Sequence, residues 1–360
     1  RINYDSNGDN GHILLEPTRT NSAASSEDFS NAFWTANTHG TIDTVNLVTA
    51  PDGKTTAQKW NRTSGLYNIV RPVSHITGTG YALSVFVKNI DADDFYLRLN
   101  KTGAAEFGYY SFSSNTVSDN DIKVEHFANN WVRLSTNVPN TSYKQFGIGR
   151  FENDSTELNH AVYIWGAQIE EGSYATSYIP TYGSAVTRAA ETLTGSGNTT
   201  LINSTEGVLF AEIAALANDG NVRYLALSDG STNNMVSILY YSGNNNVRMM
   251  VKSNGGSIAD QNTGVTSVLD FHKIAVKYKE NDFALWVDGI ERKTVTSGAT
   301  PLVLNTLESG IGGNARFYGK IKQTAIFNEA LEDDELELLT GITNFSSFGA
   351  TASGGGYTVI

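Results

Sequence analysis

The sequence predicts an all-β protein made of two antiparallel β-sandwiches in tandem. Apolar and polar residues alternate over several short stretches, with no helical period between them. Asn, Thr, Ser and Gly are abundant, whereas only 6 prolines occur among 360 residues. A small, polar stretch at residues 184–205 then divides the chain. Many short alternating strands joined by polar turns are typical of sandwiches, and the chain is long enough for two cores.

The first predicted domain covers residues 1–183. It opens with an apolar strand at residues 12–17 that ends at a proline, and alternation follows at residues 81–88, 95–100 and 131–135. The strand at residues 162–169 is apolar at all positions but Gln168, so we expect it to be buried on both faces and to close this core. Its alternation predicts one face made of Tyr163, Trp165, Ala167 and Ile169.

The second predicted domain covers residues 206–342, after a linker at residues 184–205. A hairpin is expected at residues 236–251, and Asp288 with Gly289 gives a strong two-residue hairpin signal, because glycine accepts the positive φ that such turns need. Acidic residues gather at 332–337, just before an apolar pattern that stops at Gly341, which predicts one helix. Residues 343–360 are expected to form an extended tail that could add a strand to a neighbouring chain.

Charge and composition exclude several classes of partner. There are 25 basic and 37 acidic residues, net −12, and such a field repels nucleic acid and anionic lipid but not neutral glycans. No apolar run reaches membrane-spanning length, so we expect no membrane insertion. The absence of cysteine excludes disulfides and thiolate chemistry. The opening at Arg1, without a methionine, allows an upstream segment.

No motif predicts catalysis, so we expect no enzyme activity. A glycosidase needs two carboxylates across a cleft, but the one acidic cluster, at residues 332–337, is better explained by a helix start. The six histidines never fall at metal-ligand spacing. Nucleophile, phosphate-binding and dinucleotide-binding motifs are missing as well.

Several ordered blocks in the first half resemble a known module. Residues 14–21, 26–34, 50–53, 81–88 and 165–190 resemble a jelly roll similar to family 4/9-type carbohydrate-binding modules, which occurs in phage tail and virion fibre proteins. In the second half, residues 272–278, 285–289 and 318–331 resemble the laminin G-like, concanavalin A-type lectin sandwich. Lectins, glycosidases and plain spacers share that second fold, so it does not fix a function.

Together, the two resemblances imply a non-catalytic bacteriophage tail-fibre or virion adhesin. Such a protein binds bacterial surface polysaccharide for host attachment, contacts other virion proteins, and works outside the cell on a tail or capsid fibre. The resemblance implies a homo-oligomer, with a trimer expected first. Two alternatives stay open, namely an accessory carbohydrate-binding region of a secreted polysaccharide-degrading enzyme and a purely structural capsid or fibre decoration protein.

Sugar binding needs aromatic faces beside planar hydrogen-bonding groups, because a pyranose has an apolar face and a rim of hydroxyls. If odd positions of residues 81–88 face the core, aromatic and basic side chains project from the opposite face, although ordinary packing explains them as well. The first candidates are Phe86, Tyr96, Arg98 and Tyr110. A weaker second patch is Trp60, Arg62 and Tyr67. The candidates of the second domain are Tyr240, Tyr241 and Arg248, which could equally line a contact between chains.

The resemblance also allows a structural Ca²⁺, although no cofactor is required. Related jelly rolls hold this ion between their first and last strands through carboxylate and backbone oxygens. The positions that the resemblance points to are Glu16, Asp28 and Glu170. Salt bridges or exposure to solvent would also explain each of them.

Overall fold

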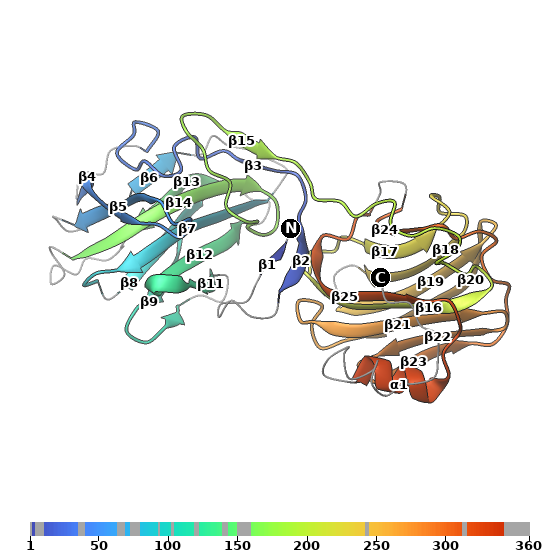
Figure 1. Ribbon diagram of the computed structural model, residues 1–360. Coiled ribbons are helices and arrows are strands. Elements are labelled where there is room, and N and C mark those ends of the chain that lie inside the picture. Colours follow the sequence, from blue (N-terminus) through green and yellow to red (C-terminus); the bar gives the residue numbers. More distant parts are fainter. Residues whose placement is uncertain are drawn as a thin grey trace. The chain divides into compact units, whose positions relative to one another are not determined.

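The computed structural model describes residues 2–3, 11–34, 40–62, 69–72, 80–92, 94–101, 104–118, 122–138, 143–149, 160–241, 245–311 and 315–341. The chain forms two compact units (Figure 1). Thr18–Ala189 form the first, which we call the first sandwich. Arg1–Pro17 and Ala190–Ile360 form the other, which we call the second sandwich. Both are built from antiparallel strands, which confirms the predicted fold class.

The first sandwich has two main sheets and a short ribbon. The six-stranded sheet has the order β11 (Ile122–Phe127), β12 (Trp131–Val138), β7 (Tyr81–Asn89), β14 (Ala161–Glu171), β5 (Thr55–Arg62) and β4 (Gly40–Thr49). The five-stranded sheet has the order β10 (Thr116–Val117), β9 (Ala104–Ser111), β8 (Asp94–Lys101), β13 (Tyr143–Gly149) and β6 (Ile69–Pro72). A 3-10 turn, η1 (Ala128–Asn130), joins β11 to β12, and β3 (Arg19–Asn21) pairs with β15 (Val186–Arg188).

The core of the first sandwich lies between these sheets. The odd-numbered residues Leu83, Val85 and Val87 of β7 point into it and share one buried cluster with Phe95 and Leu97 of β8. The alternation in β7 therefore has the expected meaning, because side chains two apart lie on the same face of a strand.

A bulge in β14 changes which of its residues face the core. The register shifts between Trp165 and Gln168, and Gly166 between them has a φ of +64°. Strict alternation put Trp165, Ala167 and Ile169 on one face, and that prediction was wrong. Ala167 and Ile169 belong to the inter-sheet core, whereas Trp165 lies in a cluster on the outer face, because one extra residue inverts the parity of a strand.

The second sandwich pairs a larger and a smaller sheet. The seven-stranded sheet has the order β1 (Ile2–Asn3), β2 (His12–Leu15), β25 (Gly319–Phe327), β16 (Glu206–Ala215), β21 (His272–Lys279), β22 (Asp282–Val287) and β23 (Ile290–Val295). The five-stranded sheet has the order β20 (Gly256–Gly264), β19 (Asn246–Ser253), β18 (Met235–Tyr241), β17 (Arg223–Ser228) and β24 (Thr306–Ser309). Their inward residues form the largest buried cluster, which contains Leu209, Ile238 and Met249.

One helix, α1 (Asp333–Gly341), covers the outer face of the seven-stranded sheet. Its buried Leu336 and Leu339 pack on Phe210 of β16 and Trp286 of β22. At its start the Glu335 carboxylate accepts a hydrogen bond of 2.9 Å from the Glu332 backbone N–H, as in a capping box. The buried residues of the helix thus pack on the seven-stranded sheet.

The first apolar strand of the chain lies in a different sandwich from the one expected. In β2, Ile13 and Leu15 are paired with Ile321 and Gly319 of β25, and Leu15 is buried in the core of the second sandwich. Residues 1–183 had been assigned to one domain, whereas the contacts group Arg1–Pro17 with the second sandwich. A four-residue strand carries no signal for its partner, because pairing depends on the free edge of a distant sheet. The predicted tail at residues 343–360 lies outside the described residues.

Candidate functional site

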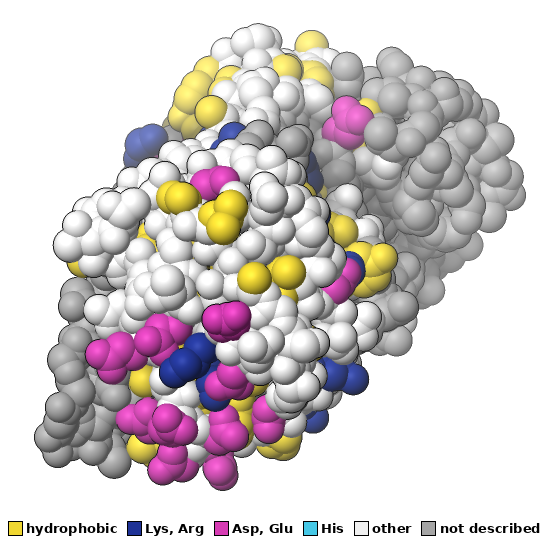
Figure 2. Space-filling view, turned by 90° about the vertical axis from the view of Figure 1, so that its right-hand side faces the viewer, with side chains coloured by type: hydrophobic (Ala, Val, Ile, Leu, Met, Phe, Trp, Pro, Cys, Tyr) yellow, Lys and Arg dark blue, Asp and Glu magenta, His cyan; other side chains and the backbone are white. Residues whose placement is uncertain are grey.

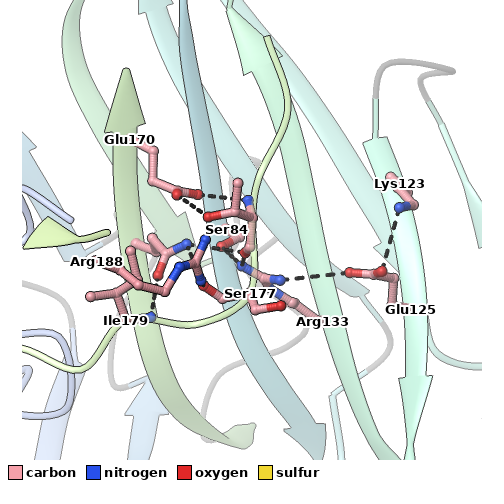
Figure 3. Close-up of polar contacts among 10 residues, drawn as sticks. Ser84, Lys123, Glu125, Arg133, Glu170, Ser177, Ile179 and Arg188 are labelled. Carbon is pink, nitrogen blue, oxygen red and sulfur yellow. Dashed lines mark hydrogen bonds and ion pairs between the residues drawn. The ribbon is translucent and has the colours of Figure 1, made fainter. Parts of the chain in front are cut away.

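The outer face of the six-stranded sheet in the first sandwich is covered by the chain itself. Residues 172–182, which we call the strap, fold back over β14. The Gln168 side chain accepts a 2.7 Å hydrogen bond from the Ile179 N–H and donates one of 3.2 Å to the Thr176 carbonyl. The Glu170 carboxylate accepts from the Thr176 N–H at 2.8 Å and from the Thr176 hydroxyl (Figure 3). Polar side chains of β14 thus hold the strap in place.

A buried arginine extends this network beneath the strap. The Arg133 guanidinium donates to the Ser84 hydroxyl at 2.8 Å and to the Thr176 carbonyl at 2.6 Å (Figure 3). It also forms an ion pair of 3.8 Å with Glu125 and lies 5.4 Å from the centre of the Phe86 ring. These contacts satisfy a buried charge, and they occupy the surface on which a ligand would otherwise lie.

Four of the predicted sugar-binding side chains are buried, which corrects the expectation that they face solvent. Phe86 is only 4% exposed, with its ring against Trp165 and Tyr178 of the outer-face cluster. The others are Trp60, Tyr110 and Tyr240. Alternation could not reveal the strap or the inter-sheet contacts, because both come from distant parts of the chain. Arg62, Tyr96 and Arg98 lie in strands, but their side chains and the whole of Tyr67 fall outside the described residues.

The three positions proposed for calcium do not form a cluster. Glu16 is buried in the second sandwich, whereas Asp28 and Glu170 belong to the first. Asp28 is exposed and accepts hydrogen bonds from Ser30, and both oxygens of Glu170 bond Thr176. Within the described parts of the chain, no group of three or more His, Cys, Asp or Glu residues could hold a metal ion. Nor is any helix there both long and apolar enough to cross a membrane.

The outer face of the five-stranded sheet in the second sandwich is the strongest candidate site. The registers place Tyr224 opposite Leu239, Leu239 opposite Arg248, and Arg248 opposite Asn262. Side chains directly opposite one another lie on the same face of a sheet, so these residues form one row across β17 to β20. Tyr240 has the opposite parity and points inward, where its hydroxyl donates to the Ile213 carbonyl at 2.7 Å.

At one end of this face Arg248 contacts both Tyr241 and Asp260, and we call these three residues the face cluster. The Arg248 guanidinium lies 5.0 Å from the centre of the Tyr241 ring, within range of a cation–π contact. Its Nε donates to one oxygen of Asp260 and its Nη2 to the other. This hydrogen bond raises the pKa of Arg248, so the cluster holds a fixed ion pair beside a tyrosine that is 40% exposed.

An apolar region adjoins the face cluster. Ala226, Met235 and Ile311 are buried together, with Tyr224 and Met250 packed against them in part. Tyr224 is half-buried, and this burial raises the pKa of its hydroxyl. Aromatic carbon surface, a guanidinium, a carboxylate and the exposed amide of Asn262 therefore lie on one face of the sheet, on which Leu239, between Tyr224 and Arg248, is buried.

Sequence reasoning found two of the three members of the face cluster. Tyr241 and Arg248 came from the predicted hairpin, whereas Asp260 was missed because no strand was expected at residues 256–264. That segment, β20, is polar at most of its positions, as an edge strand with one face in solvent can be. The one signal for it was its position directly after the hairpin.

Comparison with known proteins identifies the fold of the second sandwich as lectin-like. Residues 209–337 match the concanavalin A-like lectin/glucanases superfamily. No curated protein matches the chain.

Three solved structures show similarity at low identity. The CBM40 of Ruminococcus gnavus IT-sialidase is 16% identical, over 42% of this chain and 97% of that one, with a TM-score of 0.35. The native heptameric SAP-like pentraxin of Limulus polyphemus is 12% identical, over 43% of this chain and 77% of that one, at 0.34. Domains LG4-5 of the mouse laminin alpha1 chain are 12% identical, over 75% and 92%, at 0.28.

Proposed function

We propose that the face cluster binds glycans and that the chain is a non-catalytic attachment protein. The observation that carries this proposal is the exposed Tyr241 ring beside the paired Arg248 and Asp260 on the outer face of the five-stranded sheet. A sugar ring can place its C–H face against an aromatic side chain while its hydroxyls bond planar polar groups at the rim. Both components are present within one small area.

The acidic residues of this face support binding without cleavage. Glu308 and Asp260 lie in one row, since the registers run from Glu308 to Ala226, Ser237, Met250 and then Asp260. Four strand spacings separate them, about 19 Å. The carboxylates of glycosidases lie roughly 5 to 9.5 Å apart. In addition, Asp260 is held in an ion pair and Glu308 accepts a hydrogen bond from Ser228.

The particular role that we propose is host attachment by a bacteriophage tail fibre or another virion surface protein, with bacterial surface polysaccharide as the ligand. The resemblance of the first half of the chain to virion jelly-roll modules supports this role. A shallow face of this size gives weak binding, and several copies on one particle would convert later contacts into intramolecular ones. The alternative is an accessory carbohydrate-binding region of a secreted enzyme, and the superfamily match supports both equally.

Binding of the purified chain to an array of bacterial glycans tests the proposal. We expect Tyr241→Ala and Arg248→Ala each to weaken binding about tenfold or more, as loss of a central aromatic or arginine contact does. Tyr182→Ala is the matched control, because Tyr182 is 71% exposed and belongs to the first sandwich. Equal binding by all three variants would reject the site, and new reducing ends in the bound glycan would reject the non-catalytic role.

A further inference from the structure

We infer that the face cluster is built for neutral sugars and that Asp260 is the residue that excludes carboxylated ones. This inference rests on the proposed function, since it names the class of glycan for the same site. A guanidinium alone would favour uronic or sialic acids, because it recognises carboxylates through two parallel hydrogen bonds. The position of Asp260 changes that preference.

Asp260 already occupies the guanidinium in the way that an acidic sugar would. Two N–H groups of Arg248, on Nε and Nη2, are directed at separate oxygens of the same carboxylate. A ligand carboxylate would have to displace Asp260 from this fork or lie beside it as a like charge. Like-charge juxtaposition weakens binding strongly, whereas a neutral ligand avoids this cost.

The donors and acceptors that Arg248 and Asp260 do not use for each other suit hydroxyl groups. A guanidinium carries five N–H donors, and Asp260 engages two of them, so about three remain. The carboxylate accepts at about four lone-pair sites, of which about two remain. A sugar hydroxyl both donates and accepts, so it can use both halves of the pair. A ligand carboxylate only accepts, and it gains nothing from the free acceptor sites.

The surroundings of the site favour the same class of ligand. The chain carries a net charge of −12, which repels polyanions at long range. Figure 2 shows acidic side chains gathered in the lower part of its view. The first turn of α1 is acidic as well, but this helix packs on the other sheet and does not belong to the surroundings of the face cluster. The net charge of the chain therefore opposes the approach of an acidic polysaccharide at long range.

The test is an array on which every carboxylated bacterial polysaccharide is printed beside its carboxyl-reduced, neutral form. We expect the full chain to prefer the neutral member of each pair that it binds by about tenfold or more. In Asp260→Asn the guanidinium becomes available, so this ratio should shift about tenfold toward the acidic member. Asp334→Asn, which removes an equal charge on α1 over the other sheet, should leave the ratio unchanged.

Salt dependence of the unmodified chain gives a second measurement that does not depend on any variant folding. Binding through hydroxyls should change little between about 0.05 and about 0.5 M NaCl, whereas a new ion pair with the ligand would be screened. Tighter binding of the acidic members, lost in Arg248→Ala, would overturn the inference and leave the proposed function intact. Absence of binding to any glycan would instead reject the proposed function, and the inference with it.

Discussion

At the scale of single residues, His272 is held between two hydrogen-bond acceptors. Its Nδ1 lies 2.6 Å from a carboxylate oxygen of Asp288, and its Nε2 lies 2.9 Å from the Ser267 carbonyl. A neutral imidazole has one N–H and satisfies one of these acceptors, whereas the imidazolium satisfies both. The hydrogen bond to Asp288 accordingly raises the pKa of His272. Burial raises the pKa of Asp288, but hydrogen bonds from His272 and the Lys273 N–H outweigh it and lower this pKa.

This pair predicts a defined pH dependence of stability. A histidine whose pKa is higher in the folded state stabilises fully below the ordinary value of 6.5 and stops doing so as pH rises through the folded value. An aspartate whose pKa is lower stabilises above 3.8 and stops as pH falls through its folded value. Urea unfolding should therefore give a smaller free energy at pH 8 than at pH 6. In His272→Gln this difference between pH 6 and pH 8 should shrink. An equal difference in both proteins would show that His272 does not cause the pH dependence.

Some features of single residues can be predicted from the local sequence alone. Asp288 and Gly289 were expected to form a tight turn, and both have positive φ values, 53° and 79°, between β22 and β23. Such a turn depends on local backbone preferences alone. The burial of Phe86 could not be predicted in this way, because the strap that covers it begins more than 80 positions later in the chain.

At the scale of elements, the strap depends on the polar side chains of β14. Glu170 is fully buried and accepts two hydrogen bonds from Thr176. In Glu170→Ala both donors lose their acceptor inside the protein, which costs about 1–3 kcal/mol. We expect urea unfolding to give this loss and hydrogen exchange to show a less protected Thr176 amide. Glu171→Ala is the control, since Glu171 is exposed at the end of the same strand. Unchanged protection of Thr176 would refute this role of Glu170.

The elements themselves were largely predictable, but their faces were not. The alternation of β7 and the acidic start of α1 come from local sequence and were interpreted correctly. The faces of β14 beyond Trp165 were not, because a bulge with a left-handed glycine inverts the parity of the strand. A Cβ on Gly166 would lie 3.0 Å from Phe86 and 3.2 Å from Tyr178, so the side chains packed there fit this glycine closely.

At the scale of the whole molecule, the chain crosses between its two folding units twice. It begins in the second sandwich with β1 and β2, builds the first sandwich, and returns after Ala189. The sequence predicted two β-domains on either side of a polar linker at residues 184–205. In the structure this stretch contains Val186–Arg188, which pair with β3 of the first sandwich, and Ile202, which is buried in the core of the second. The sequence did not predict which sandwich the first apolar strand joins, since strand partners far apart in the chain leave no local signal.

Replacing Leu15 tests whether β2 belongs to the second sandwich. It is buried in the core of the second sandwich, so Leu15→Ala should remove about 2–4 kcal/mol of stability from that unit. Hydrogen exchange should become faster in β25, which pairs with β2, and stay unchanged in β7 of the first sandwich. Ile13→Ala on the same strand is the control, because Ile13 is exposed. Faster exchange in β7 alone would assign the strand to the other unit.

Glycan binding by the outer face of the five-stranded sheet in the second sandwich is the main proposal. The most direct measurement is hydrogen exchange across the full chain, with and without the glycan that binds best on the array. We predict that protection increases in β18, β19 and β20, around Tyr241, Arg248 and Asp260, and that β7 and β12 do not change. Protection confined to the first sandwich, or no change anywhere at saturating glycan, would contradict the account.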